Sequence, residues 1–333
     1  MTALLVVLDE LVITARRAQR WHVEAALAGE SLTCAAADPR APGRVYCGGA
    51  DGLWRSDDAG RTWASINDRL PVRHVTAVAV ARHADGHAGA SPVYAGTEPS
   101  RLFRSSDGGE TWTELPALTT LPSRSEWSFP PRPHTHHVRW IEIDPAVPAR
   151  IFIAIEAGAL VRTLDGGETW RDRVPGGPFD THTLATHAGA PGRLYSAAGD
   201  GYFESTDGGE TWRRDVRGLG HRYLVGVAVD PGDPGTVLVS ASSGPWTAYT
   251  PRRGEAFVYR RSGSGAWKAI DGVAAGAGTT VTHFAATDTP GMLYGANNRG
   301  IFRTEDGGAR WSAVDVPWGA DYQAQGAVAL LAL

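Results

Sequence analysis

Histidines recur at the beginnings of short apolar segments that are far apart in the chain. These segments read "RHVTAVAV", "HTHHVRWIEI", "DTHTLATH" and "TVTHFAAT". Neutral imidazoles combined with one or two carboxylates are a common ligand set for zinc, manganese, iron or copper. If the fold brings the segments together, the sequence predicts a centre for one divalent metal ion. Its expected ligands are His74, His137, His182 and Glu156, with His283 in reserve.

The histidines keep regular positions within their segments. When the segments are aligned on the Asp-Pro that often closes them, His74 and His137 coincide. Arg139, His182 and His283 then coincide two residues further along. Because residues two apart on a strand point to the same face, we expect imidazoles from several segments to point into one channel.

Such a centre predicts an enzyme of the hydrolase or lyase type, because a bound ion lowers the pKa of water or polarises a carbonyl group. We expect a small polar or anionic substrate, with Arg139 and Arg222 holding its anionic part. A metal-free glycoside hydrolase is an alternative, because such enzymes need two carboxyl groups at a suitable separation. The residues assigned to catalysis are Glu98, Glu156, Asp200, Arg139 and Tyr223.

A long loop, Leu115 to His137, ends at one of the histidine segments and carries five prolines, which stiffen it. Polar residues at the beginning of a strand often simply face water. Trp127 and Phe129 are expected to fasten the loop onto the fold rather than to stack on a substrate. The residues assigned to substrate binding are Arg73, Arg124, Trp127, His136, His221 and Arg222.

The elements that must position these residues are organised by a repeated phrase. "SSDGGETW" begins at Ser105, "TLDGGETW" at Thr163 and "STDGGETW" at Ser205. Weaker copies begin at Ser56 and Thr304, and "SGSGAW", from Ser262, lacks the Asp. The spacing of about 40–60 residues is close to that of a four-stranded propeller blade.

The text around each copy predicts four short strands per unit, bounded by Gly, Pro and Asp. We therefore expect one domain, residues 1–333, that is an all-β, seven-bladed β-propeller of four-stranded antiparallel blades. Strands from the two ends of the chain share one blade, which closes the ring and removes exposed sheet edges. The expected blades cover residues 3–27 with 324–333, 31–67, 74–117, 137–174, 181–217, 223–271 and 280–315.

The repeated phrase resembles the Asp-box, or BNR, repeat of sialidase-like and other propellers. Its Asp accepts backbone N–H groups within its own turn and its Gly supplies positive φ, so the phrase is expected to be scaffolding. The Arg-Ile-Pro motif and the Tyr–Glu pair of sialidases are not recognisable, so a sialidase is disfavoured. The resemblance also implies a third possibility, a non-catalytic propeller that binds a protein or peptide, as photosystem assembly factors and sortilin-type receptors do.

Composition narrows the function further. The 333 residues carry a net charge of −4, which gives no sign of a nucleic-acid or membrane partner. The two cysteines, Cys34 and Cys47, are expected to be reduced thiols in the core. The first residues lack a basic start and are interrupted by Asp9 and Glu10, so a cytoplasmic protein without a signal peptide is expected. No nucleotide cofactor is expected, and the oligomeric state is left open.

Overall fold

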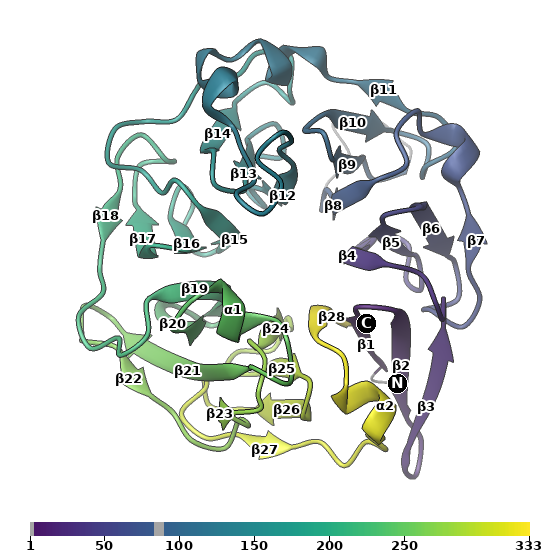
Figure 1. Cartoon of the computed structure of the whole chain (residues 1–333), viewed down its shortest axis with the longest axis vertical. Coiled ribbons are helices and arrows are strands. Elements are labelled where there is room, and N and C mark those ends of the chain that lie inside the picture. Colours follow the sequence, from purple (N-terminus) through teal and green to yellow (C-terminus); the bar gives the residue numbers. More distant parts are fainter. Residues whose placement is uncertain (1–2, 83–89) are drawn as a thin grey trace.

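Seven antiparallel sheets surround a central axis in the computed structural model, which describes residues 3–82 and 90–333 (Figure 1). Each sheet is a blade whose innermost strand lies beside the axis, and the chain moves outward through the blade before it enters the next one. The predicted all-β, seven-bladed propeller is therefore confirmed. No helix in the described ranges is long and apolar enough to cross a membrane.

Three blades contain the first part of the chain. From the axis outward, the first blade consists of β28 (Ala327–Ala332), β1 (Ala3–Leu8), β2 (Leu11–Arg17) and β3 (Trp21–Ala26). The second consists of β4 (Leu32–Ala37), β5 (Val45–Gly49), β6 (Gly52–Ser56) and β7 (Ala64–Ser65). The third consists of β8 (Val75–Val80), β9 (Val93–Thr97), β10 (Leu102–Ser105) and β11 (Thr113–Glu114).

Four blades complete the ring. The fourth holds β12 (Val138–Ile143), β13 (Ile151–Ile155) and β14 (Ala159–Thr163), and the fifth holds β15 (Thr181–Thr186), β16 (Leu194–Ala198), β17 (Gly201–Ser205) and β18 (Arg213–Arg214). The sixth holds β19 (Tyr223–Asp230), β20 (Asp233–Ser242), β21 (Glu255–Ser262), β22 (Lys268–Ala269) and β23 (Gly276–Ala277). The seventh holds β24 (His283–Ala286), β25 (Leu293–Asn297), β26 (Gly300–Thr304) and β27 (Ser312–Ala313).

Two blades depart from the four-stranded pattern. The fourth has only three strands, because its outermost segment is reduced to a single bridge between Arg162 and Arg171. The sixth has a fifth strand, β23, which pairs with the beginning of β21. Within residues 3–82 and 90–333, five short helices lie between strands: η1 (Asn67–Arg69), η2 (Pro116–Thr120), η3 (Pro122–Glu126), α1 (Pro245–Ala248) and α2 (Ala320–Gln323).

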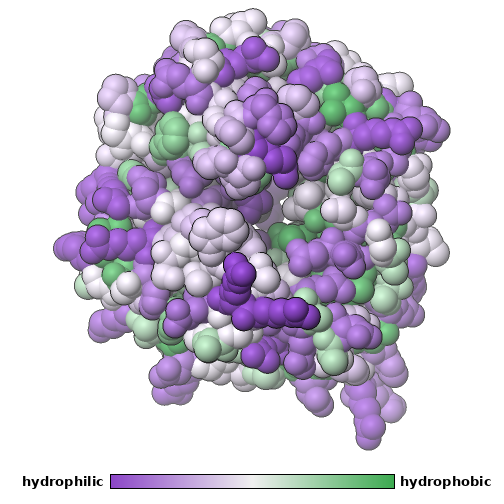
Figure 2. Space-filling model, viewed as in Figure 1, coloured by the Kyte–Doolittle hydropathy of each residue, from purple (hydrophilic) through white to green (hydrophobic). Residues whose placement is uncertain are grey.

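The ring is closed by a strand from each end of the chain. β28 pairs antiparallel with β1, from Leu4 opposite Ala332 to Leu8 opposite Ala327. The innermost strands then contact one another in the order β28, β4, β8, β12, β15, β19 and β24, which returns to β28. This arrangement confirms the predicted shared blade and sets the innermost strands around a central axis, where Figure 2 shows a hollow that we call the channel mouth.

The core lies in layers between neighbouring blades rather than at one centre. Tyr46 and Leu53 of the second blade, for example, are buried against Val75 and Phe103 of the third. Burying such faces removes apolar surface from water, which stabilises the fold by about 25 cal/mol for each Å². Every blade is thus held by its two neighbours, which fixes the innermost strands around the channel.

The repeated phrase forms a turn whose polar groups bind one another. In the third blade, Ser105 Oγ donates to Asp107 Oδ1 at 2.7 Å and accepts from Gly109 N at 2.8 Å. Asp107 also accepts from the backbone and the hydroxyl of Thr111. Gly109 has φ 91°, which side chains rarely tolerate. The same bonds recur at Asp58, Asp165, Asp207 and, without the Thr hydroxyl, at Asp306, so turn chemistry accounts for these carboxylates.

Candidate functional site

A β-bulge recurs at one point of the innermost strands and turns one side chain toward the channel. The pairing register of β4, β8, β12, β15 and β19 shifts by one residue at this point. Bulges of this kind re-aim the side chain of the extra residue. The residues skipped by the pairing, which we call the bulge layer, are Thr33, Thr76, Arg139, His182 and Val225.

The bulge layer confirms that Arg139 and His182 are equivalent, but it corrects the predicted alignment of His283. Thr287 in the seventh blade is equivalent to Asp144 in the fourth. The backbone N–H of Thr287 donates to Met292 O, as that of Asp144 donates to Arg150 O. Thr282, five residues earlier, is then the counterpart of Arg139. The Asp-Pro rule failed because Asp288 stands one residue later than the other closing aspartates.

The residues two positions before the bulge layer form a second set, which we call the rim layer. In the second to fifth blades, their backbone oxygens accept hydrogen bonds from the turn between the second and third strands of the same blade. Glu98 N donates to His74 O at 3.0 Å, and Glu156 N donates to His137 O at 3.3 Å. This repeated bond places a turn carboxylate beside a rim histidine in two successive blades. The rim layer consists of Ser31, His74, His137, Asp180 and Tyr223.

Glu156 is held by two cationic or hydrogen-bonding side chains at the channel mouth. Its Oε2 lies 2.8 Å from His137 Nε2 and 3.3 Å from Arg139 Nε. Burial alone would raise the pKa of Glu156, but the hydrogen bond from His137 and the charge of Arg139 overcome it and lower the pKa to about 2. Glu156 is therefore a fixed anion at neutral pH, and its other oxygen, Oε1, faces His182.

His182 is fully buried and has its tautomer set by a contact between blades. Its Nδ1 lies 2.6 Å from the backbone oxygen of Leu224. A carbonyl only accepts, so Nδ1 carries the hydrogen and Nε2 of the neutral ring has a free lone pair. Thr33 and Thr76 make the equivalent bonds, from their hydroxyls to the oxygens of Val75 and Val138, each at 2.7 Å. His182 therefore stands where other blades have a structural threonine, and its second nitrogen faces Glu156, Asp180 and Tyr223.

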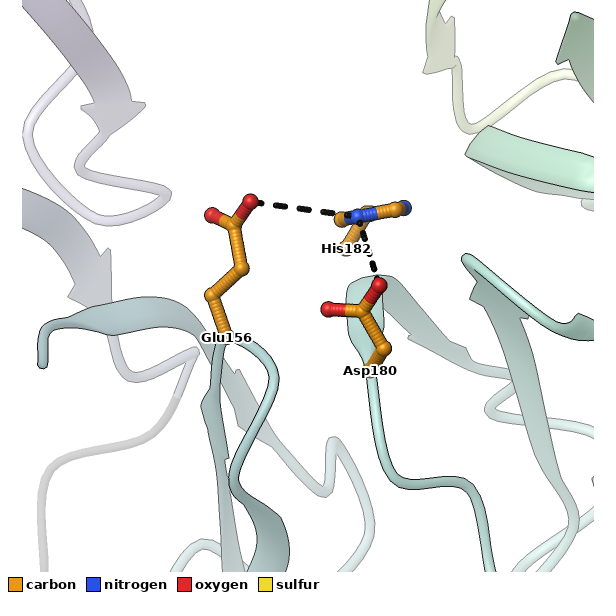
Figure 3. Close-up of side chains that lie close together, drawn as sticks. All are labelled: Glu156, Asp180 and His182. Atoms are coloured by element: carbon orange, nitrogen blue, oxygen red, sulfur yellow. Dashed lines mark ion pairs between the residues drawn. The ribbon is translucent and has the colours of Figure 1, made fainter. Parts of the chain in front are cut away.

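Three possible ligand atoms meet at His182 Nε2 (Figure 3). Asp180 Oδ2 lies 3.6 Å away and Glu156 Oε1 lies 4.0 Å away. All three atoms lie within 4.8 Å of one another. Asp180 Oδ1 accepts from the N–H of Ala157 at 2.8 Å, which fixes the carboxylate in this orientation. This group of Glu156, Asp180 and His182, which we call the Glu–Asp–His cluster, comes from two neighbouring blades.

Two tyrosines connect His182 to Arg139 across the mouth. Tyr223 Oη lies 3.3 Å from His182 Nε2 and 3.3 Å from Tyr249 Oη. Tyr249, which follows α1, is in turn hydrogen-bonded to Arg139. Burial raises the pKa of Tyr223 well above its usual value and that of Tyr249 to about 12, so both hydroxyls stay protonated. A continuous hydrogen-bonded chain therefore borders the cluster.

The long loop before β12 covers the side of the mouth next to Glu98. Arg132 binds Glu98 with both of its forked nitrogens, at 3.2 and 2.7 Å. Burial raises the pKa of Glu98, but Arg132 outweighs this and lowers it. His74 Nδ1 and His137 Nδ1 each lie 3.8 Å from Glu98 Oε2, beyond hydrogen-bond distance. His74 therefore belongs to the neighbouring Glu98 group and not to the Glu–Asp–His cluster.

Several predicted site residues face the protein interior. Trp127 is buried and donates its indole N–H to Ser123 Oγ at 2.9 Å, so it fastens the loop. His136 packs edge-on against Trp127 and accepts from the N–H of Ser100. His221 stacks on Phe257 with ring centroids 4.1 Å apart and binds Tyr259 Oη. Trp127, His136 and His221 therefore hold loops rather than line the channel.

The remaining predicted residues lie around the cluster or at the surface. Arg73, Arg124 and Arg222 are exposed. Asp200 is exposed as well, and its pKa is raised by partial burial and by the charge of Asp180. His283 lies near Arg139, and burial together with that charge lowers its pKa to about 3. None of these five is among the three ligand atoms that meet at His182 Nε2.

Sequence reasoning did not assign Asp180 and Tyr249 to the site. Asp180 has a signal in the sequence, because the alignment that matches His74 with His137 also places Asp180 at the same position. Tyr249 has no such signal, since it lies in an insertion between β20 and β21 that interrupts the repeat. The two cysteines are free thiols, and burial raises the pKa of Cys34 to about 12 and that of Cys47 well above its usual value.

Comparison with known proteins supports the repeat and the architecture. The family model of the BNR/Asp-box repeat matches residues 203–214. Among solved structures, the GH74 enzyme of Niastella koreensis superposes with a TM-score of 0.61 at 20% identity, over 84% of this chain and 46% of its own. This chain thus spans less than half the length of that enzyme. No curated protein gives a significant match.

Two other similar structures are of about the same length as this chain. YCF48 bound to D1 peptide has a TM-score of 0.60 at 15% identity, over 90% of both chains. The WD40 β-propeller domain of Doa1 has a TM-score of 0.60 at 13% identity, over 91% of this chain and 88% of its own. Such low identities show only a common fold. The chain is a seven-bladed β-propeller that carries the BNR/Asp-box repeat.

Proposed function

We propose that this propeller is a divalent-metal-dependent enzyme of the hydrolase or lyase type, with its reaction centre at the channel mouth. The observation that carries the proposal is the meeting of Glu156 Oε1, Asp180 Oδ2 and His182 Nε2 within 4.8 Å of one another. A nitrogen and two carboxylate oxygens suit zinc, manganese or iron. Figure 2 shows the face hollowed near the centre of the ring, which gives a small polar substrate access.

The geometry of the cluster is close to what an ion requires. Atoms bound to one zinc ion at about 2.0–2.1 Å in tetrahedral geometry lie about 3.3–3.5 Å apart. The two separations from His182 Nε2 are 3.6 and 4.0 Å, so small side-chain movements would suffice. The Nδ1 bond of His182 to a backbone carbonyl orients the ring, as the partners of metal-binding histidines usually do.

The chemistry follows from three protein ligands and an open fourth position. An ion held there would lower the pKa of a bound water or polarise a substrate carbonyl. Arg139 is assigned to the anionic part of the substrate, because its positive charge lies beside Glu156 at the mouth. Glu156 accepts from His137 and is kept ionised, so it serves as a ligand rather than as a proton donor.

Two alternatives rest on other observations. The GH74 likeness extends to the fold and invites a metal-free glycoside hydrolase, which needs one protonated and one ionised carboxyl group. Glu98 and Glu156 both have lowered pKa values, which does not suit the acid. The pKa of Asp200 is raised, which is the direction that an acid needs. A peptide-binding propeller is suggested by the likeness to YCF48 bound to D1 peptide. Peptide binding gives no role to the Glu–Asp–His cluster.

Equilibrium dialysis against zinc, manganese or iron(II), followed by elemental analysis of untagged protein, tests the proposal. We expect one ion per chain for the preferred metal. His182→Thr is the most informative variant, because its hydroxyl restores the blade-to-blade bond found at Thr33 and Thr76 while the ligand is lost. It should keep the melting temperature within a few degrees and lose the ion. His74→Thr is the matched control and should retain it.

An activity screen then separates the functions. Protein loaded with the preferred ion is assayed on aryl esters, lactones, aryl phosphates and aryl glycosides, with and without a chelator. Turnover that is lost with the chelator and in His182→Thr is the expected result. Stoichiometric binding that survives in His182→Thr, or glycoside cleavage that is indifferent to the chelator, would contradict the proposal.

A further inference from the structure

We propose that the Tyr223 hydroxyl and the metal ion compete for His182 Nε2, and that the ion, once bound, releases this hydroxyl to donate a hydrogen bond to the substrate. This inference rests on the proposed metal centre and deepens it. It assigns Tyr223 a place in binding that its position in the rim layer alone does not give. The contacts that carry it are the 3.3 Å separation from His182 and the chain of bonds behind Tyr223.

The direction of every bond in this chain is set by its ends. Leu224 O only accepts, so His182 donates from Nδ1, and Nε2 of the neutral imidazole is then an acceptor. Tyr223 therefore donates to His182. At the other end, the guanidinium of Arg139 only donates, so Tyr249 accepts from Arg139 and donates to Tyr223. The Tyr223 hydrogen is the one member of the chain that can change its acceptor.

A single lone pair on Nε2 decides the competition. It lies in the plane of the ring, and it can accept the Tyr223 hydrogen or bind an ion, but not both. Asp180 Oδ2 and Glu156 Oε1 stand 3.6 and 4.0 Å from the same nitrogen. An ion that joins these three atoms would occupy the line along which Tyr223 now donates.

The other contacts of Tyr223 keep its side chain in place when it no longer donates to His182 Nε2. Tyr249 still donates to its oxygen, and its ring remains against the imidazole of His182, with ring centroids 4.9 Å apart. The freed hydrogen then points into the mouth beside the ion. A substrate oxygen bound at the fourth position, such as a carbonyl, ester or phosphoryl oxygen, is the acceptor that this geometry offers. The inferred substrate class is therefore an oxygen-rich electrophile whose anionic part reaches Arg139.

Calorimetric titration with Co²⁺ and Zn²⁺ tests the competition in the full chain. Tyr223→Phe keeps the ring beside His182 and removes only the hydroxyl. We expect it to bind each ion about two- to tenfold more tightly, the ratio that corresponds to losing one neutral competing hydrogen bond. Tyr249→Phe is the matched control, because Tyr223 can still donate to His182, and its affinity should stay within about twofold of the wild type.

A second readout follows the nitrogen itself. In ¹⁵N-detected spectra, His182 Nε2 should show a lone-pair nitrogen in both the ion-free wild type and Tyr223→Phe, and its signal should move on adding Zn²⁺. If the wild type binds an ion and Tyr223→Phe binds equally or more weakly, the competition is refuted while the metal centre stands. If neither protein binds an ion, both proposals fail. Binding in Tyr223→Phe alone would support the competition, because the hydrogen bond would then suffice to exclude the ion.

Discussion

His182 shows how a structural position can acquire a reactive atom. In the second and third blades, the equivalent hydroxyls of Thr33 and Thr76 bind the next innermost strand and reach no further. The imidazole makes the same bond with Nδ1 and places Nε2 near Glu156 and Asp180. A threonine-to-histidine difference at one bulge thus adds a nitrogen beside two carboxylates and keeps the contact that holds two blades together.

At the residue scale, sequence reasoning brought together part of the cluster. Glu156 and His182 were expected to converge, and the structure places them 4.0 Å apart. Asp180 was not predicted, although it stands two residues before His182, at the position that His74 and His137 hold in their segments. Tyr249 could not be placed, because an insertion has no fixed register with the repeat. His221 stays a prediction as a substrate-binding residue, and in the structure it precedes β19 and stacks on Phe257.

His283 predicts a specific dependence of stability on pH. Its pKa in the folded protein is lowered to about 3 by burial and by Arg139, whereas an unfolded histidine titrates near 6.5. Between these values the unfolded chain binds more protons, so this contribution to stability is complete above about pH 6.5 and is lost as the pH falls toward 3. His283→Gln should therefore reduce the fall in melting temperature between pH 7 and pH 5, as measured by calorimetry.

The control for this prediction removes one histidine elsewhere. His22 lies exposed on β3, and His22→Gln should leave the difference between the two melting temperatures as it is in the wild type. If His283→Gln and the wild type lose the same number of degrees on acidification, the buried, uncharged state assigned to His283 is wrong.

At the scale of elements, the sixth blade replaces its missing Asp-box with a buried charge network. Arg261 is fully buried, binds Glu204 and lies 3.3 Å from Asp215 Oδ2. Its guanidinium also lies over the rings of Tyr202 and Trp267, at 4.7 and 5.1 Å from their centroids. The network connects the fifth and sixth blades at the place where the repeated turn is degenerate.

Arg261→Met should destabilise the fold more than the loss of an ordinary ion pair. The change leaves the carboxylates of Glu204 and Asp215 buried, although other arginines at the edge of the network still reach them. We expect a loss of about 2–4 kcal/mol in the free energy of unfolding, somewhat below the usual cost of breaking a buried pair. Chemical denaturation monitored by tryptophan fluorescence measures it.

Arg101→Met provides the comparison, because Arg101 forms a forked ion pair with Glu114 at the surface of the third blade. Exposed pairs contribute about 1 kcal/mol or less. Equal losses in the two variants would show that the network of Arg261 does not hold the two blades together.

At the scale of the whole molecule, stability depends on closing the ring. Leu330 is buried in β28, which supplies the inner partner of β1. Removing residues 326–333 would expose the inner edge of β1 and open the contact between β28 and β4. We expect the truncated chain to melt at least 10 °C lower, a shift of a few kcal/mol, and to associate on size-exclusion chromatography.

Leu330→Ala is the graded version of this test. It should cost about 2–5 kcal/mol, as large-to-small changes in a core do, and keep the chain monodisperse. If the truncated chain has the same melting temperature as the wild type, the other six blades are stable without ring closure.

The architecture was predictable from the sequence because the same turn occurs once in most blades, at the spacing of a propeller blade. Each copy of the turn fixes its own polar bonds, and six copies with regular spacing leave few other arrangements for the strands. The departures were not predictable for the same reason. The missing fourth strand of the fourth blade and the extra β23 of the sixth depend on contacts between segments that share no repeat.

The most direct test of the central claim is anomalous diffraction from crystals of the untagged protein grown with zinc or manganese. We expect one strong peak per chain at the channel mouth, about 2.0–2.2 Å from His182 Nε2, Asp180 Oδ2 and Glu156 Oε1. The same crystals of His182→Thr should lack it. A mouth without a peak in wild-type crystals, with Tyr223 still donating to His182, would contradict the account.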